Sequence, residues 1–283
     1  QAQAHLLALV RDGQTLAEAA AGERVDVVLD ITPFYGESGG QVGDVGEIVG
    51  PDGRLTVTDT VRPVPGVTVH RAVVASGTLR VGDAVTAHVD VERRLDIARN
   101  HTATHLLHRA LRQVLGEHAA QAGSLVTPER LRFDFSHLAS LTPEELRRVA
   151  EIVNAQVRAD RPVTTRLSDF EEATRSGAIA LFGEKYADQV RVVSVEGYTA
   201  ELCGGTHLER TGQIGLFLIE SEGSVGAGLR RIEALTGRGA EAYVCAKLET
   251  LQAVGAALGA RPGEELSRAQ ELVEQLREQR RLA

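Results

Sequence analysis

The sequence predicts an α+β protein with a small N-terminal β-barrel subdomain, a mixed α/β core and a C-terminal helical tail. Residues 1–90 contain short runs rich in Val and Thr, such as RVDVVLDI and LTVTDTV, separated by Gly, Pro and Asp turns. Several short strands at this spacing are typical of a small barrel. Residues 91–240 begin with a segment whose apolar residues have helical spacing, and residues 241–283 are predicted to be helical.

The middle region mixes helices and strands. A helix is predicted from residue 91 to a stop at Gly116, where glycine favours a C-cap. A second helix is predicted to begin at Thr142, because TPEE forms a capping box with proline at the first helical position. PVTTRLS, VRVVSV and the two sides of the glycine-rich turn in ESEGSVGAGLRR read as strands.

Composition excludes several classes of protein. The chain has 283 residues, 43% of them hydrophobic and 25% charged, and contains no apolar run long enough to span a membrane. The net charge of −8 argues against a broad basic surface for indiscriminate nucleic-acid binding, although it permits a local basic groove. Two cysteines form no disulfide framework, which favours a reducing cytoplasm. The absence of methionine suggests a piece of a longer chain.

Two histidines in HTATHLLH are spaced to share one helix face. Positions i and i+4 on a helix place their Cβ atoms roughly 5–6 Å apart, so His101 and His105 can point at one centre. Alone, such a pair more often consists of two ordinary polar residues near a helix start. Cys203 and His207, in ELCGGTH, repeat the same separation across two glycines. Three imidazoles and one thiol make a tetrahedral zinc set, so the four residues are predicted metal ligands.

The spacing restricts what the metal does. A zincin protease needs HExxH, but Thr102 follows His101, so peptide hydrolysis is not supported. Ninety-eight positions separate His105 from Cys203, too many for a zinc finger, so two separate elements must converge on the ion. Four protein donors are typical of a structural zinc site, whereas a catalytic site keeps a position open for water. The sequence leaves both roles open.

These motifs together resemble the editing domain of alanyl-tRNA synthetases, and the metal motifs also resemble the related AlaX deacylases. HTATHLLH is followed by GSLV and RFDFSH, and ELCGGTH comes about a hundred residues later. FYGESGGQVGD resembles the barrel subdomain that precedes the editing core in these synthetases, and LFGEKY and RRIEALTG match as well. The resemblance covers residues from about 5 to about 240, and the charged helical tail is similar to the link toward a dimerisation region.

The resemblance implies an aminoacyl-tRNA deacylase that hydrolyses the ester of tRNA(Ala) mischarged with serine or glycine, with a zinc ion held by His101, His105, Cys203 and His207. Thr104 matches a family residue linked to serine recognition; its alternative is a hydroxyl bonded back to the preceding helical turn. Gln121 matches a residue whose loss impairs editing; its alternative is a surface glutamine. Both are expected in the catalytic and substrate-binding site.

Other residues are expected to bind substrate. Asp134 in RFDF alternates with aromatic residues and is expected to face the pocket. Gly39 and Gly40 are expected to form a loop whose backbone approaches the tRNA end or the editing core, unless they only make a tight turn. Lys185 and either Arg230 or Arg231 are expected to contact tRNA phosphates, with a solvated surface as the alternative.

Three functions remain open from the sequence alone. The first is a deacylase domain within an alanine ligase, acting beside the rest of the synthetase chain, with a homodimer through the C-terminal region. The second is a freestanding AlaX-like deacylase. The third is a tRNA-binding module without chemistry. No ATP-binding motif is recognisable, so aminoacylation by this chain alone is not expected.

Overall fold

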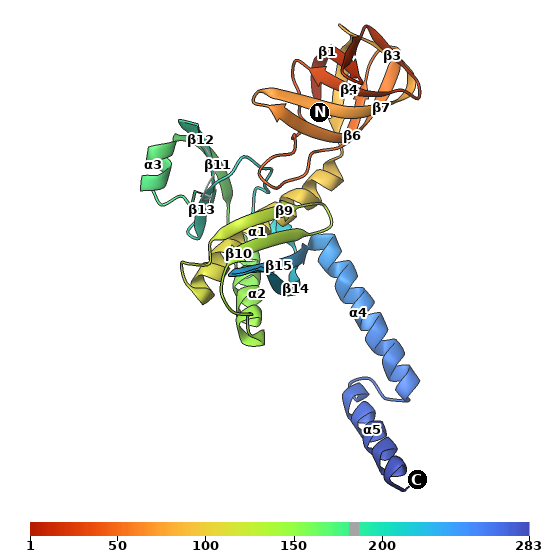
Figure 1. The fold of residues 1–283 in the computed structure, drawn as a ribbon, viewed down its shortest axis with the longest axis vertical. Coiled ribbons are helices and arrows are strands. Elements are labelled where there is room, and N and C mark those ends of the chain that lie inside the picture. The colour runs from red at the N-terminus through yellow and green to blue at the C-terminus, as the bar shows by residue number, and fades with distance from the viewer. Residues whose placement is uncertain (181–186, 283) are drawn as a thin grey trace. The chain divides into compact units, whose positions relative to one another are not determined.

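In the computed structural model, which describes residues 1–180 and 187–282, the first ninety residues form a closed β-barrel (Figure 1). Six strands close an antiparallel ring in the order β1-β4-β7-β6-β5-β8, because β8 pairs back onto β1. Alternate side chains of these strands point inward and fill the barrel with aliphatic groups. The strands are β1 (Ala2–Arg11), β2 (Gln14–Leu16), β3 (Glu18–Ala20), β4 (Arg24–Leu29), β5 (Gly46–Val49), β6 (Gly53–Val64), β7 (Val67–Arg80) and β8 (Ala84–Val89).

The core begins with α1 (Val91–Leu115), which packs with α2 (Pro143–Arg158) against a four-stranded antiparallel sheet. The sheet has the order β14-β15-β10-β9, and its buried residues Phe133, Phe135 and Ile232 meet Leu107 and Leu111 of α1. Its elements are β9 (Gln121–Val126), β10 (Leu131–Ser136), β14 (Phe217–Gly226) and β15 (Leu229–Thr236), with the short helix η1 (Thr211–Ile214) beside α1 and α2.

A second, smaller sheet has its own hydrophobic cluster. β11 (Val163–Asp169), β12 (Gln189–Val195) and β13 (Thr199–Leu202) pair in that order, and α3 (Phe170–Arg175) packs against the first two. Ala173, Val190 and Val192 are buried between them. β13 also contacts α1, and Cys203 follows directly after its last residue. This sheet therefore delivers the second metal motif to the helix that carries the first.

Local signals in the sequence explain the ends of the long helices. Asp90 caps α1 by accepting a hydrogen bond from the Arg93 amide at 3.0 Å, and Gly116, at φ +108°, ends it as expected. The predicted capping box at Thr142 is confirmed: its hydroxyl accepts from the Glu145 amide, and the Glu145 carboxylate accepts from the Thr142 amide.

Main-chain hydrogen bonds join the barrel to the core. The loop after β4 runs alongside β9, where Gln41 and Val126 form a parallel bridge. The Val126 amide donates to the Gly40 carbonyl at 2.7 Å, and the Val42 amide donates to the Val126 carbonyl at 3.1 Å. Buried Asp44 pairs with Arg94 of α1 beside this joint. The barrel loop is thus held against the strand that begins at Gln121.

The predicted helical tail is confirmed and forms a second compact unit, Arg238–Ala283, described here by itself. It contains most of α4 (Gly237–Leu258) and all of α5 (Glu265–Leu282), separated at Arg261-Pro262-Gly263. The described residues form no helix with the length and hydropathy needed to cross a membrane.

Two leucines test the packing of the core. Leu111 is fully buried on α1, whereas Leu138 is 93% exposed. Leu111→Ala is expected to lower the free energy of unfolding by about 2–5 kcal/mol, since it removes apolar contacts and leaves a cavity. Leu138→Ala is the matched control and should change it by less than about 0.5 kcal/mol. Urea unfolding followed by circular dichroism measures both, and equal effects would contradict the assigned packing.

Candidate metal centre

The four residues of the two metal motifs converge on one point. The donor atoms of His101, His105, Cys203 and His207 all lie within 4.8 Å of one another. His101 and His105 come from the buried centre of α1, and Cys203 and His207 come from the turn after β13. Cys203 Sγ lies 3.4 Å from His101 Nε2 and 3.3 Å from His207 Nε2. The cluster could hold a metal ion, and its nitrogen and sulfur donors suit zinc.

Each imidazole of this cluster has an outer polar group near its Nδ1 atom, although His105 Nδ1 makes no hydrogen bond to the one it faces. His101 Nδ1 lies 2.6 Å from Gln41 Oε1, His207 Nδ1 lies 3.2 Å from Thr102 Oγ1, and His105 Nδ1 lies 3.4 Å from Glu201 Oε2. Metal-ligating histidines usually donate their second ring nitrogen to such a group, which fixes the tautomer and the ring orientation. The arrangement therefore fits three imidazoles that offer Nε2 to an ion.

The electrostatics of the cluster favour an ionised thiol. Burial raises the pKa of Cys203, but nearby His101 and hydrogen bonds from the imidazoles bring it well below its usual value. Burial lowers the pKa of His105, but Glu201 and the Cys203 sulfur raise it to about 9. Burial and neighbouring imidazoles lower the pKa of His207 to about 3. A thiolate and neutral imidazoles are the forms that bind a metal, and binding would release the proton held on His105.

A pocket of about 480 Å³ opens onto this cluster. Three of the four ligand residues line it, together with Thr104 and Gln121. The barrel supplies part of its wall through Tyr35, Ser38, Gly39 and Arg62, and the small sheet supplies Gln189, Arg191 and Glu201. The Arg62 guanidinium lies 5.6 Å from the centre of the Tyr35 ring, at the edge of the pocket.

Thr104 and Gln121 both line this pocket. The Thr104 hydroxyl donates to the Asn100 carbonyl at 2.8 Å, which is the back-bonded geometry that the sequence offered as the alternative. Its oxygen still has acceptor capacity toward the pocket it lines, so the two readings are compatible. Gln121 lies at the start of β9, with Nε2 3.4 Å from Ser124 Oγ.

The glycine loop of the barrel approaches the core as one reading of the sequence expected. A Cβ atom on Gly40, which has φ +79°, would lie 2.4 Å from the Ser124 carbonyl oxygen, so only glycine fits there. Its neighbour Gly39 lines the pocket.

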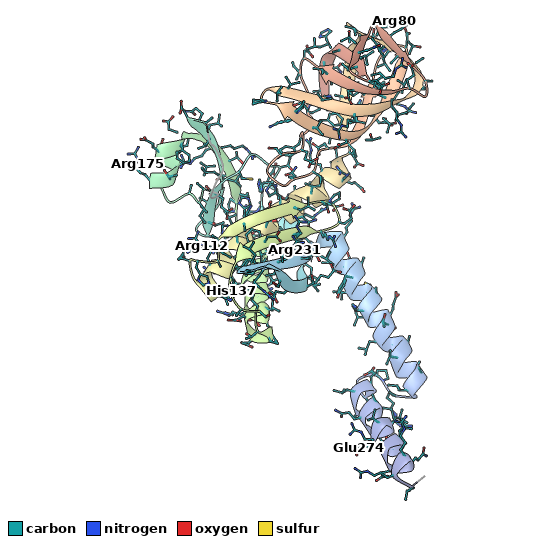
Figure 2. All side chains as sticks on the ribbon, viewed as in Figure 1. Arg80, Arg112, His137, Arg175, Arg231 and Glu274 are labelled. Carbon is teal, nitrogen blue, oxygen red and sulfur yellow. The ribbon has the colours of Figure 1, made fainter. Side chains whose placement is uncertain are left out.

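Several predicted binding residues lie elsewhere. Asp134 on β10 faces away from the buried Phe133 and Phe135 and makes a two-pronged ion pair with Arg231 of β15, at 2.7 and 2.8 Å. Arg231 is labelled in Figure 2. Arg230 is 9% exposed and pairs with Glu222 at 2.6 Å. Neither Asp134 nor Arg230 is among the described residues that line the pocket. Lys185 lies outside the described residues.

The sequence reading missed the residues around the ligands. Glu201 is buried and accepts from His108 Nδ1 at 3.1 Å while it faces His105. In the sequence, the one sign that Glu201 belongs to the site is its position two residues before Cys203. Its contact with His105 depends on β13 lying beside α1. Gln41 and Thr102 gave no signal, because a glutamine in a glycine loop and a threonine in a helix have many ordinary uses.

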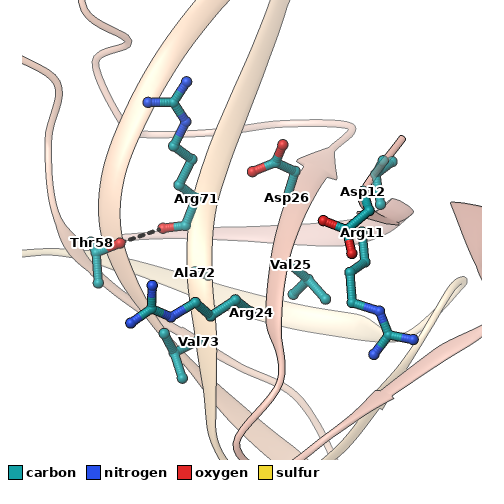
Figure 3. A pocket seen from close by; sticks show the side chains of 10 residues that line it. Arg11, Asp12, Arg24, Val25, Asp26, Thr58, Arg71, Ala72 and Val73 are labelled. Carbon is teal, nitrogen blue, oxygen red and sulfur yellow. Dashed lines mark hydrogen bonds between the residues drawn. The ribbon is translucent and has the colours of Figure 1, made fainter. Parts of the chain in front are cut away.

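A larger hollow, of about 520 Å³, lies on the outside of the barrel (Figure 3). Arginine and aspartate side chains both line it, and Arg11 and Arg71 pair with Glu23 and Asp59. Opposite charges are therefore mixed along its wall, and it contains none of the four clustered ligands. We place the candidate site at the metal cluster, where ligand and pocket residues coincide.

Two adjacent glycines test the packing of the cluster. A Cβ atom on Gly205 would lie 2.1 Å from the His101 ring, whereas one on Gly204 would meet nothing within 4 Å. Gly205→Ala is expected to displace His101 and lower the free energy of unfolding by about 1–3 kcal/mol. Gly204→Ala should change it by less than about 0.5 kcal/mol. Thermal unfolding of the metal-free chain compares them, and a tolerated Gly205→Ala would show that the turn lies farther from α1.

Known proteins match this chain over nearly all of its length. It is 55% identical to the alanine--tRNA ligase of Roseiflexus sp. (strain RS-1) over 97% of this chain and 33% of that protein. The ligases of Chloroflexus aurantiacus and Rhizobium meliloti are 52% and 50% identical, each over 98% of this chain and 32% of their own length.

Two family models also match. Residues 1–93 match the model described as tRNA synthetases class II (A), and residues 190–233 match that of the threonyl and alanyl tRNA synthetase second additional domain. The second match contains the strand that leads to Cys203, and Cys203 and His207 themselves. The chain spans about a third of the length of the curated relatives it matches. The chain therefore belongs to the alanine--tRNA ligase family, as the counterpart of one segment of those proteins.

Proposed function

We propose that this chain is an aminoacyl-tRNA deacylase domain that removes serine or glycine attached in error to tRNA(Ala). One observation carries the proposal: a single pocket joins the four-residue metal cluster to Thr104 and Gln121 in a relative of alanine ligases. Water adds to the ester carbonyl carbon, the bond to the ribose oxygen breaks, and the free amino acid and tRNA(Ala) result. The remainder of a synthetase chain is the natural partner of such a domain.

The need for such a site follows from the chemistry of alanine. A synthetic pocket that fits alanine cannot exclude glycine by size, and a hydroxyl on an isosteric side chain is rejected by only ~10²-fold in comparable pockets. A second site must accept serine and spare alanine. The Thr104 hydroxyl donates to the Asn100 carbonyl, and its oxygen can in addition accept from the serine hydroxyl, a hydrogen bond that alanine cannot make.

The pocket also has positively charged side chains, which an RNA end with its anionic phosphates requires. Arg62 and Arg191 line it, although the chain as a whole carries a charge of −8. Arg191 donates to the Cys203 carbonyl at 3.0 Å and so fixes the turn that holds the thiol. Arg62 is exposed, and its guanidinium can meet a phosphate or a base stacked near Tyr35.

The metal ligands in this proposal are His101, His105, Cys203 and His207, and zinc is the ion that their donor atoms suit best. When bound, the ion would supply Lewis-acid polarisation or a fixed anchor for the substrate. Gln121 at the pocket wall can orient the ester or a water molecule through its amide. A homodimer through the C-terminal region and a cytoplasmic location remain predictions.

Two cysteines allow a matched test of this activity. Cys203 belongs to the cluster, whereas Cys245 is exposed on α4. We expect the chain to deacylate Ser-tRNA(Ala) much faster than Ala-tRNA(Ala), and Cys203→Ala to lose this activity together with bound zinc. Cys245→Ala should retain both. Ester loss from labelled tRNA and metal analysis of the purified chains give the readouts.

The outcomes separate the alternatives. A folded, zinc-loaded chain that binds tRNA(Ala) without releasing serine would identify a binding module and contradict the proposal. Retained deacylation by zinc-free Cys203→Ala would instead show that the ion has no part in the reaction.

Thr104 provides a test of substrate choice. Thr104→Val removes the acceptor oxygen at nearly constant volume, so deacylation of Ser-tRNA(Ala) should fall roughly tenfold or more, equivalent to about 1.4 kcal/mol or more. Glycine has no hydroxyl to make this contact, so Gly-tRNA(Ala) is the internal control. Its deacylation rate should change by less than about threefold. Equal losses on the two substrates would show that Thr104 acts only through the helix.

A further inference from the structure

Gln41 connects the barrel to the metal cluster through its side chain. It is fully buried, although it belongs to the glycine loop of the barrel, sixty positions before His101. Its Oε1 atom lies 2.6 Å from His101 Nδ1, 2.9 Å from the Thr206 amide nitrogen and 3.2 Å from Thr206 Oγ1. One amide oxygen therefore contacts a ligand on α1 and a residue between the two ligands of the second motif.

The orientation of this amide is fixed by the backbone. The Thr206 N–H can only donate, so the Gln41 atom that faces it must be the oxygen. The same oxygen can only accept, so His101 Nδ1 must carry a proton and donate to it. That tautomer leaves the lone pair on His101 Nε2, the nitrogen that faces Cys203 Sγ at 3.4 Å.

The surroundings leave Gln41 little freedom. The parallel bridge to Val126 and the flanking hydrogen bonds hold its backbone against β9. A Cβ atom on Gly205 would lie 2.8 Å from Gln41 Oε1 and 2.1 Å from the His101 ring, so the oxygen is packed tightly against the turn. An outer partner that is held in place raises the affinity of a ligand for its metal.

We propose that Gln41 is a positioning residue for the metal centre, which makes the barrel a functional part of that centre. The inference rests on the proposed metal site but not on the identity of the ester. Gln41 acts through His101: it holds the imidazole in the tautomer and orientation that present Nε2 beside Cys203. A core without the barrel loop would keep all four ligands and still bind the ion more weakly.

Substitutions at position 41 separate the hydrogen bond from the packing. Gln41→Met keeps the approximate length and volume but removes the acceptor, so zinc affinity should fall about 10–100-fold, the usual effect of losing an outer partner. Gln41→Glu keeps an acceptor toward His101 and Thr206 and should stay within about fivefold of the unsubstituted chain. Gln3 lies on β1 of the barrel, away from the metal cluster, so Gln3→Met is the control and should leave zinc affinity unchanged.

The measurement is zinc affinity by competition with a chelator, together with the visible absorption spectrum of the cobalt-substituted chain. Gln41→Met should weaken the affinity and alter the cobalt bands, because His101 is no longer held. Equal affinity and spectra for Gln41→Met and the unsubstituted chain would overturn the inference and leave the proposed function intact. Absence of metal binding by the unsubstituted chain would overturn both.

Thermal unfolding of the metal-free chains gives the second control. Loss of metal-free stability in Gln41→Met without loss of zinc affinity would identify a packing role only, and would overturn the inference. If Gln41→Met does not fold, Gln41→Asn repeats the test, since it keeps the amide but withdraws the oxygen by one methylene. Its affinity should fall in the same range, and an unchanged affinity would count against the proposal.

Discussion

The structure depends on the convergence of two ligand pairs that lie far apart along the chain. The donor atoms of three imidazoles and one thiol lie within 4.8 Å of one another. His101 and His105 are buried in the centre of α1, and Cys203 and His207 lie in the turn after β13. Polar groups are costly to bury unless they are paired, and each of these imidazoles has a partner outside the cluster. The surrounding fold supplies those partners from the barrel loop, from α1 itself and from β13.

This constraint explains why three pieces of structure meet at one place. α1 carries His101 and His105 and packs into the core through the leucines on its other side. The small sheet carries Glu201 and ends at Cys203, and Arg191 of β12 fixes the turn that follows. The pocket takes its walls from all three pieces, so its shape depends on their relative positions within this unit.

The sequence predicted much of this because its strongest signals are local. Short runs rich in Val and Thr, separated by turns, predicted the barrel in the first ninety residues, and the capping box at Thr142 predicted the start of α2; the structure confirms both. The spacing of the two motifs predicted that these four residues meet, because histidine and cysteine are rare enough for a repeated interval to stand out. Zinc itself and the reaction remain proposals.

What the sequence could not supply are the contacts made across long separations. Asp134 alternates with aromatic residues as predicted, but an arginine on the next strand neutralises it, and that pairing depends on the register of β10 and β15. The role of Glu201 depends on β13 lying beside α1. Such partners are common residue types whose use becomes visible only when the sheet order is known.

Part of the joint between barrel and core is made by main-chain atoms alone, and this has a consequence for how the protein can vary. The Gly40 carbonyl and the Val126 N–H and carbonyl are backbone groups that every residue except proline can offer, so these bonds do not depend on the side chain at position 126, which is itself fully buried. Position 40 is different, because a side chain there would collide with the Ser124 carbonyl. The hydrogen bonds of this joint are therefore independent of side-chain identity at a position such as 126, whereas two backbones that touch at position 40 leave room for glycine alone.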